Sequence, residues 1–323
     1  MNRLRFSHVL AAALLFSSAA TVAQQPNLES QRIRAASEQF QTRLDEAARA
    51  LGNNPRLKKV SEQKRRQLAE FVVGNMLFTL LHESAHGLLN QMELPVLGKE
   101  EDAADAFATV TMLKMGTALS HGVLIEASKA WFLTDKRDRK EGTPTEAYDA
   151  HGLDEQRAYQ IVCLMVGSNK QEFKDLADHT NLPDDRQDSC WNDYASASWS
   201  WDKVLQPHRR TPEQPRRKIE VTYGPGKGDF DVYAQIFQSI GILEPVAERF
   251  ADTYAWPNPL GLEMASCGEV NAAWDPQERK VVLCYELAQD FAQLFRDYGQ
   301  DWQAPPKEKW WQPKWWKRVK RTP

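Results

Sequence analysis

The sequence predicts an α+β fold that is mostly helical, with a small β-hairpin or sheet region towards its C-terminal end. Apolar residues recur at helical spacing through most of residues 27–178, whereas clear strand-like patterns follow Lys218. The chain has 323 residues, 26% of them charged, and a formal net charge of -3, which is typical of a soluble globular protein. This near-neutral balance argues against a nucleic-acid partner.

The N-terminal segment has the pattern of a secretory signal peptide. Arg3 and Arg5 precede a short apolar run from Val9 to Phe16, and small residues follow before Gln24. The apolar run is too short to span a bilayer comfortably, so we expect residues 1–23 to be cleaved rather than kept as an anchor. The mature protein would then be exported, either to the periplasm or to the medium.

The mature chain is expected to begin with helices. The first covers residues 27–53 and ends at a cluster of glycine, asparagine and proline. A second begins at Ser61 and becomes apolar nearly all round in LAEFVVGNMLFTLLHESAHGLL, so its end should be buried. A third begins near Lys99, and later helical patterns cover residues 122–134, 154–167 and 170–178.

Residues 201–218 are rich in proline and arginine and lack periodicity, which predicts an exposed linker. The linker would separate a helical region, residues 24–200, from an α/β region, residues 219–303. For the α/β region the patterns predict a short strand with a glycine-rich turn, helices near residues 229–240, 243–253 and 286–297, and a hairpin in CGEVNAAWDPQERKVVLCYEL.

The four cysteines are an even number without a CxxC pair, which is typical of disulfides in an oxidising compartment. Sequence order suggests the bridges Cys163–Cys190 and Cys267–Cys284, one in each region. Four cysteines allow three connectivities, and the sequence alone does not choose between them.

The strongest chemical signal is the stretch LLHESAHGLL, residues 80–89. On a helix, His82 and His86 lie on one face, so both rings can bind one zinc ion. Glu83 is then placed to take the proton of the attacking water as general base. The alternative is a core helix without metal. Each of the three polar side chains would then need its own hydrogen-bond partner to offset the cost of burial.

A hydrolytic zinc site needs a third protein ligand. The stretch after His86 lacks the third histidine of metzincins, and Leu89 stands where their glycine would be, but EEDAADAFA supplies the gluzincin arrangement on a following helix. Glu101 and Asp105 lie four residues apart there, so we expect Glu101 to bind zinc and Asp105 to accept the distal N–H of a ligand histidine. Asp102 and Asp105 are alternatives as third ligand, and acidic residues also favour a helix start.

Three segments resemble those of an uncharacterised bacterial family of metallopeptidases. They are the gluzincin-type signature LHESAHGLL…LPVLGKEEDAADAFA, DEQRAYQIVCLMVGS and CGEVNAAWDPQERKVVLCYEL, which together cover much of the mature chain. The resemblance implies a zincin-like fold with a pair of active-site helices, one zinc ion per chain, and hydrolysis of a peptide or protein substrate.

The order of elements departs from that of zincins in general. In zincins the sheet whose edge strand holds the substrate precedes the HExxH helix, whereas the strands predicted here follow Lys218. The C-terminal hairpin would therefore have to supply that sheet.

The group that stabilises the tetrahedral intermediate is less determined than the metal ligands. The stretch EAYDAHGLDEQRAY offers a histidine, tyrosines and an arginine close together. We expect His151 in this role, with Tyr148 and Arg157 as alternatives, and each of the three also suits an ordinary structural role.

The chain ends in a basic, tryptophan-rich tail, residues 304–323. Its last part, KEKWWQPKWWKRVKRTP, carries seven Lys or Arg against one Glu and four of the eleven tryptophans. This composition suits peripheral contact with a membrane or with an anionic envelope polymer. The alternative is a tail folded back over the body of the protein.

Taken together, the patterns favour an exported zinc metallopeptidase. A second hypothesis is an envelope binding protein that keeps zinc for structure and docks through its tail. A third is an inactive scaffold without metal.

Overall fold

The structure, a computed structural model, describes residues 28–53, 58–143, 150–299 and 302. The signal peptide predicted at 1–23 and the tail at 304–323 lie outside these residues. The helices are α1 (Leu28–Ala50), α2 (Glu62–Gln91), α3 (Glu100–Met115), α4 (Ala118–Glu141), α5 (Asp154–Ser168), α6 (Lys170–His179), α7 (Asp184–Leu205), α8 (Asp231–Ile240), α9 (Leu243–Thr253) and α10 (Tyr285–Tyr298). The strands are β1 (Glu220–Tyr223), β2 (Gly261–Ala265), β3 (Ala272–Asp275) and β4 (Lys280–Cys284). The mostly helical α+β prediction is confirmed.

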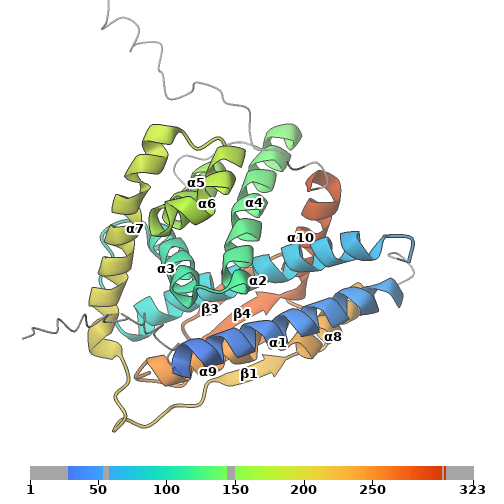
Figure 1. The fold of residues 1–323 in the computed structure, drawn as a ribbon. Coiled ribbons are helices and arrows are strands. Elements are labelled where there is room, and N and C mark those ends of the chain that lie inside the picture. The colour runs from blue at the N-terminus through green and yellow to red at the C-terminus, as the bar shows by residue number, and fades with distance from the viewer. Residues whose placement is uncertain (1–27, 54–57, 144–149, 300–301, 303–323) are drawn as a thin grey trace, which may run out of the picture.

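Helix α2 lies at the centre of the arrangement. Helices α3 to α7 lie on one side of it, and α1, α8, α9 and the sheet lie on the other (Figure 1). The helix begins where the Ser61 side chain accepts a hydrogen bond from the Lys64 N–H. Its second half is apolar nearly all round, and neighbouring elements bury most of it, as the sequence predicts.

The sheet has the strand order β1-β2-β4-β3. Strands β1, β2 and β4 are parallel, and β3 pairs antiparallel with β4 as the predicted hairpin. Strand β2 was not predicted, because it has five residues and places only Leu262 and Met264 into the core. All four strands follow Lys218, and β3 and β4 pack against α2. The chain after Lys218 therefore supplies the sheet beside the HExxH helix.

Strand β3 forms an edge of the sheet and approaches α2 closely at Trp274. The indole ring lies against Gly87, where an added Cβ atom would come within 3.1 Å of Trp274 Cε3. The Trp274 N–H donates a hydrogen bond of 3.1 Å to Glu83 Oε2. Since the Cys284 N–H bonds to Asn271 O, the alternation of an antiparallel ladder turns the N–H of Trp274 away from β4.

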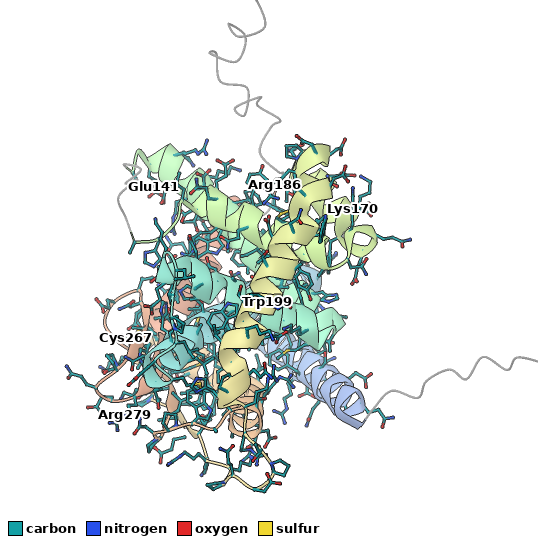
Figure 2. All side chains as sticks on the ribbon, turned by 90° about the vertical axis from the view of Figure 1, so that its left-hand side faces the viewer. Glu141, Lys170, Arg186, Trp199, Cys267 and Arg279 are labelled. Carbon is teal, nitrogen blue, oxygen red and sulfur yellow. A yellow bond between two sulfur atoms is a disulfide. The ribbon has the colours of Figure 1, made fainter. Side chains whose placement is uncertain are left out.

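Helix α7 corrects the linker prediction. It runs to Leu205, so the first five residues of 201–218 are helical, and Trp201 is buried. Its buried side chains recur at helical spacing, from Cys190 through Trp201 to Leu205, but serines and aspartates dominate the rest. The sparse apolar pattern explains why the helix was missed. Trp199 lies on its outer face and is 64% exposed (Figure 2), and residues 211–218 are exposed.

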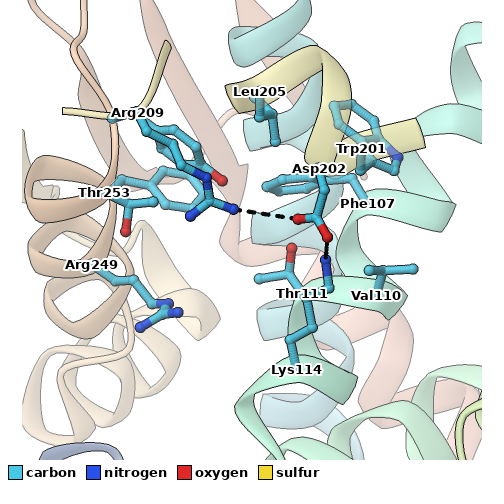
Figure 3. Close-up of a pocket in the computed structure, with 12 residues that line it drawn as sticks. Phe107, Val110, Thr111, Lys114, Trp201, Asp202, Leu205, Arg209, Arg249 and Thr253 are labelled. Carbon is cyan, nitrogen blue, oxygen red and sulfur yellow. Dashed lines mark hydrogen bonds and ion pairs between the residues drawn. The ribbon is translucent and has the colours of Figure 1, made fainter. Parts of the chain in front are cut away.

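The end of α7 packs on α3 around a small pocket of about 70 Å³ that also contacts α9 (Figure 3). The Asp202 carboxylate lies 2.7 Å from Lys114 Nζ and 3.3 Å from Arg209 Nη2. These partly exposed ion pairs contribute little to stability. The stronger contact between α3 and α7 is apolar. The rings of Phe107 and Trp201 meet edge to face, with their centroids 4.9 Å apart.

Two disulfides connect elements in the pairing that sequence order suggests. Cys163–Cys190 joins α5 to α7, and Cys267–Cys284 joins the segment after β2 to the end of β4. In the part of the chain that the structure describes, no helix has the length and apolarity needed to cross a membrane.

The contact between α2 and β3 makes Gly87 sensitive to substitution. We expect Gly87→Val to lower the free energy of unfolding by about 1–3 kcal/mol, because its methyl groups must displace the Trp274 ring. The matched control is Gly122→Val in α4, where an added Cβ meets no atom within 4 Å and stability should change little. Urea denaturation of both variants measures this, and equal stability of the two would contradict the packing.

Candidate metal centre

The candidate centre lies between helices α2 and α3. His82 and His86 project from the buried second half of α2, and Glu101 lies in the first turn of α3. Asp105 follows Glu101 by one turn, so both carboxylates face α2. His82 is 5% exposed and Asp105 is 2% exposed. The structure thus brings together the three expected ligands and Asp105.

Three atoms form a triangle of the size that zinc needs. His82 Nε2 lies 3.1 Å from Glu101 Oε2, His86 Nε2 lies 3.3 Å from His82 Nε2, and His86 Nε2 lies 3.6 Å from Glu101 Oε1. Ligand atoms of a tetrahedral zinc ion, each about 2.0–2.1 Å from the metal, are about 3.3 Å from one another. His82, His86 and Glu101 therefore fit one metal ion without rearrangement of either helix.

The Nδ1 atom of each of the two imidazole rings lies within hydrogen-bond distance of a carboxylate. His82 Nδ1 lies 2.8 Å from Asp105 Oδ1, and His86 Nδ1 lies 2.7 Å from Glu100 Oε1. A carboxylate that accepts the Nδ1–H leaves Nε2 as the nitrogen that can bind metal. Asp105 thus contacts the ring on the side away from the triangle, and Asp102 Oδ1 lies beside Gly152, 3.5 Å from the position of an added Cβ. Neither competes with Glu101 in this geometry.

The charges of the centre are strongly coupled. Burial lowers the pKa of His82, but hydrogen bonds with Asp105 and Glu101 outweigh this effect and raise the pKa to about 9. Hydrogen bonds with His82 and His86 hold the pKa of Glu101 well below its usual range. Because a bound metal needs the neutral imidazoles, metal binding would release protons here.

Glu83 lies next to this triangle and is half-buried. Its Oε2 atom accepts the N–H of Trp274, so strand β3 helps to hold the carboxylate in place. Burial raises the pKa of Glu83, although the charges of His82 and His86 oppose the shift. A carboxylate with a raised pKa beside a metal triangle is suited to accept a proton and release it again.

The three candidates for stabilising the intermediate differ in position. His151 Nε2 lies 3.1 Å from Glu101 Oε2, and the His151 side chain is 51% exposed. Arg157 is buried, with Nε 2.7 Å from Asp105 Oδ2 and Nη2 2.9 Å from Asp105 Oδ1, so its guanidinium faces Asp105 rather than the open side. The Arg157 guanidinium is therefore engaged by Asp105, and Tyr148 lies outside the described residues.

Two contacts of the centre were not expected from the sequence. Glu100, one of the acidic residues in the first turn of α3, also lies 2.7 Å from His86 Nδ1. The sequence feature that could have predicted this contact is the position of Glu100 directly before Glu101 in an acidic first turn. The Trp274 contact with Glu83 joins residues 191 positions apart, so no local sequence pattern could have predicted it.

Comparison with known families agrees with this geometry. A family model described as "Putative metallopeptidase" matches residues 33–205 and 225–312. The chain belongs to this family. Membership supports protease activity on peptide or protein substrates and a metal ion, and the candidate His and Glu residues supply donors for one. No curated protein and no solved structure matches the chain significantly.

The triangle predicts which side chains control metal content. The protein purified without chelator should hold about one metal ion per chain, and His86→Ala and Glu101→Ala should each weaken binding by at least about tenfold. His121→Ala is the matched control, because His121 pairs with Glu172 on other helices. Elemental analysis after dialysis measures this. Equal loss in all three variants, or in none, would contradict the assignment.

Proposed function

We propose that the protein is an exported zinc-dependent metallopeptidase that hydrolyses peptide bonds. The observation that carries the proposal is the triangle of His82, His86 and Glu101, with Glu83 beside it. Two imidazole nitrogens and one carboxylate are the donor set of catalytic zinc sites that keep a position open for water or substrate.

In this proposal His82, His86 and Glu101 hold the ion. When bound, zinc supplies a Lewis acid that polarises the substrate carbonyl and lowers the pKa of a bound water to about 7. Asp105 and Glu100 fix the orientation of the two imidazole rings through Nδ1. Glu101 is itself restrained by His151, which lies 3.1 Å away.

Glu83 would act as the general base and then as the general acid. Its carboxylate takes a proton from the attacking water as the new C–O bond forms. It returns the proton to the amide nitrogen as the C–N bond breaks. The backbone N–H of Trp274 keeps this carboxylate beside the centre.

His151 is proposed to stabilise the oxygen on which negative charge develops. Its Nε2 atom lies 3.1 Å from Glu101, next to the proposed ligands, and 51% of its side chain is exposed to solvent. A donor directed at the developing charge is worth several kcal/mol in other hydrolases, about 2.7–4 for one lost donor.

The edge of β3 offers a place for an extended peptide. By the alternation of the ladder, the N–H and C=O of Ala272 and the C=O of Trp274 point away from β4, whereas the Trp274 N–H is already bonded to Glu83. An added strand would bond to this edge, as peptides do at exposed sheet edges. Because Trp274 also contacts Glu83, a peptide on this edge would pass close to the general base.

Export is supported by the disulfides and by the pattern of residues 1–23. Both bridges join cysteines within the described chain, and such bridges persist in oxidising compartments. The contact of the basic tail with a membrane or an envelope polymer stays a prediction, because the tail lies outside the described residues. The binding-protein alternative is less favoured, since structural zinc has four protein ligands and the candidate group has three among the residues that the structure describes.

The role of Glu83 can be separated from metal binding. We expect Glu83→Gln to keep its zinc and to lose about 10²–10⁴-fold in kcat, because the amide cannot accept the proton. Glu70→Gln, on the same helix and paired with Arg66, should retain activity. A library of quenched fluorescent peptides gives the rate, and elemental analysis gives the zinc content. Full activity in Glu83→Gln would refute the proposed base, and zinc-loaded wild type that cleaves no peptide would favour the binding protein.

A further inference from the structure

A buried chain of contacts continues from His82 away from the triangle. The Asp105 carboxylate that bonds His82 Nδ1 also accepts two hydrogen bonds from Arg157, of 2.7 and 2.9 Å. The guanidinium carbon of Arg157 lies 3.7 Å from the centre of the Trp131 ring. His82, Asp105 and Arg157 are 5%, 2% and 6% exposed, so all three are shielded from water.

We propose that Arg157 is a positioning residue of the metal centre, which acts through Asp105 to orient the His82 ring for metal binding. This inference rests on the proposed function, since it concerns the same centre. It assigns Arg157 no contact with substrate or metal.

The geometry explains why an arginine is needed at this position. Asp105 Oδ1 is shared between His82 Nδ1 and Arg157 Nη2, while Oδ2 bonds Arg157 Nε. The planar fork binds both oxygens and so fixes the plane of the carboxylate. With that plane fixed, the oxygen that meets His82 cannot rotate, and the ring keeps Nε2 directed at the triangle. A lysine at this position would supply charge without fixing the plane.

Arg157 is itself held on two sides. Its guanidinium stacks on Trp131 of α4, and its backbone lies in the first turn of α5. The segment just before α5 carries His151, whose Nε2 lies 3.1 Å from Glu101 and whose carbonyl accepts a hydrogen bond from Lys99. The start of α5 and the segment just before it thus contact Asp105 and Glu101, two of the three carboxylates that α3 presents to α2. This makes α5 a support for the metal centre rather than a distant helix.

A merely structural salt bridge is the competing explanation, and the chain offers one for comparison. Arg137 of α4 donates two hydrogen bonds of 3.1 Å to Asp290 of α10. It bridges two helices as Arg157 does, but neither partner contacts the ligands. Arg137→Met should therefore cost stability without changing the affinity for metal.

The test is the zinc dissociation constant of the full mature chain, measured by competition with a chelator. We expect Arg157→Met to weaken zinc binding about tenfold, Asp105→Asn by about 10–100-fold, and the double variant by no more than Asp105→Asn alone. Thermal unfolding of each metal-free variant confirms that it is folded. Should Arg157→Met fail to fold, Arg157→Lys takes its place, with a smaller but measurable loss of affinity.

The outcomes separate the inference from the proposed function. Zinc affinity within twofold of wild type in the folded Arg157 variant, or losses that multiply in the double variant, would overturn the inference alone. An equal loss in Arg137→Met would also overturn it, because the effect would then follow stability. A wild-type protein that binds no zinc would overturn the proposed function, and the positioning role would fall with it.

Discussion

Burial of His82 within an apolar helix is the constraint on which the rest of the centre depends. A polar ring that is 5% exposed is unfavourable unless each of its nitrogens has a partner, and here both partners are carboxylates. The carboxylates are in turn unfavourable in this position without cations. Asp105 accepts hydrogen bonds from Arg157. Burial raises the pKa of Asp105, but the hydrogen bonds with His82 and Arg157 outweigh this effect and hold the pKa below its usual range. The charges of the centre are therefore stable only as a set.

This constraint explains how the surrounding elements are arranged. Helix α3 must begin close to α2 to present Glu101 and Asp105, and its fully buried alanines Ala104 and Ala108 allow the approach. Helix α5 must deliver Arg157 to the same carboxylate, and the disulfide Cys163–Cys190 ties α5 to α7. On the opposite side, β3 approaches α2 at Gly87 and bonds Glu83 through its backbone. The helices thus hold the three proposed metal ligands, while the sheet holds Glu83, the proposed general base.

The sequence predicted the parts of this arrangement that depend on short-range spacing. Histidines four apart, and Glu101 and Asp105 four apart, lie on single helix faces whatever surrounds them. The contacts of Arg157 with Asp105 and of Trp274 with Glu83 join residues 52 and 191 positions apart, so only the packed fold reveals them. Helix α7 and strand β2 were missed for a different reason, because their few buried side chains give weak periodicity. The placement of these side chains on their helices was therefore predictable, and the distant contacts that support them were not.

The most direct test of the account is a crystal structure of the zinc-loaded protein with anomalous data collected at the zinc edge. The proposed centre should give one peak, about 2.0–2.2 Å from Nε2 of His82, Nε2 of His86 and a carboxylate oxygen of Glu101, with a ligand from solvent in the fourth position. A peak elsewhere, or an ion enclosed by four protein ligands, would contradict a catalytic centre between α2 and α3.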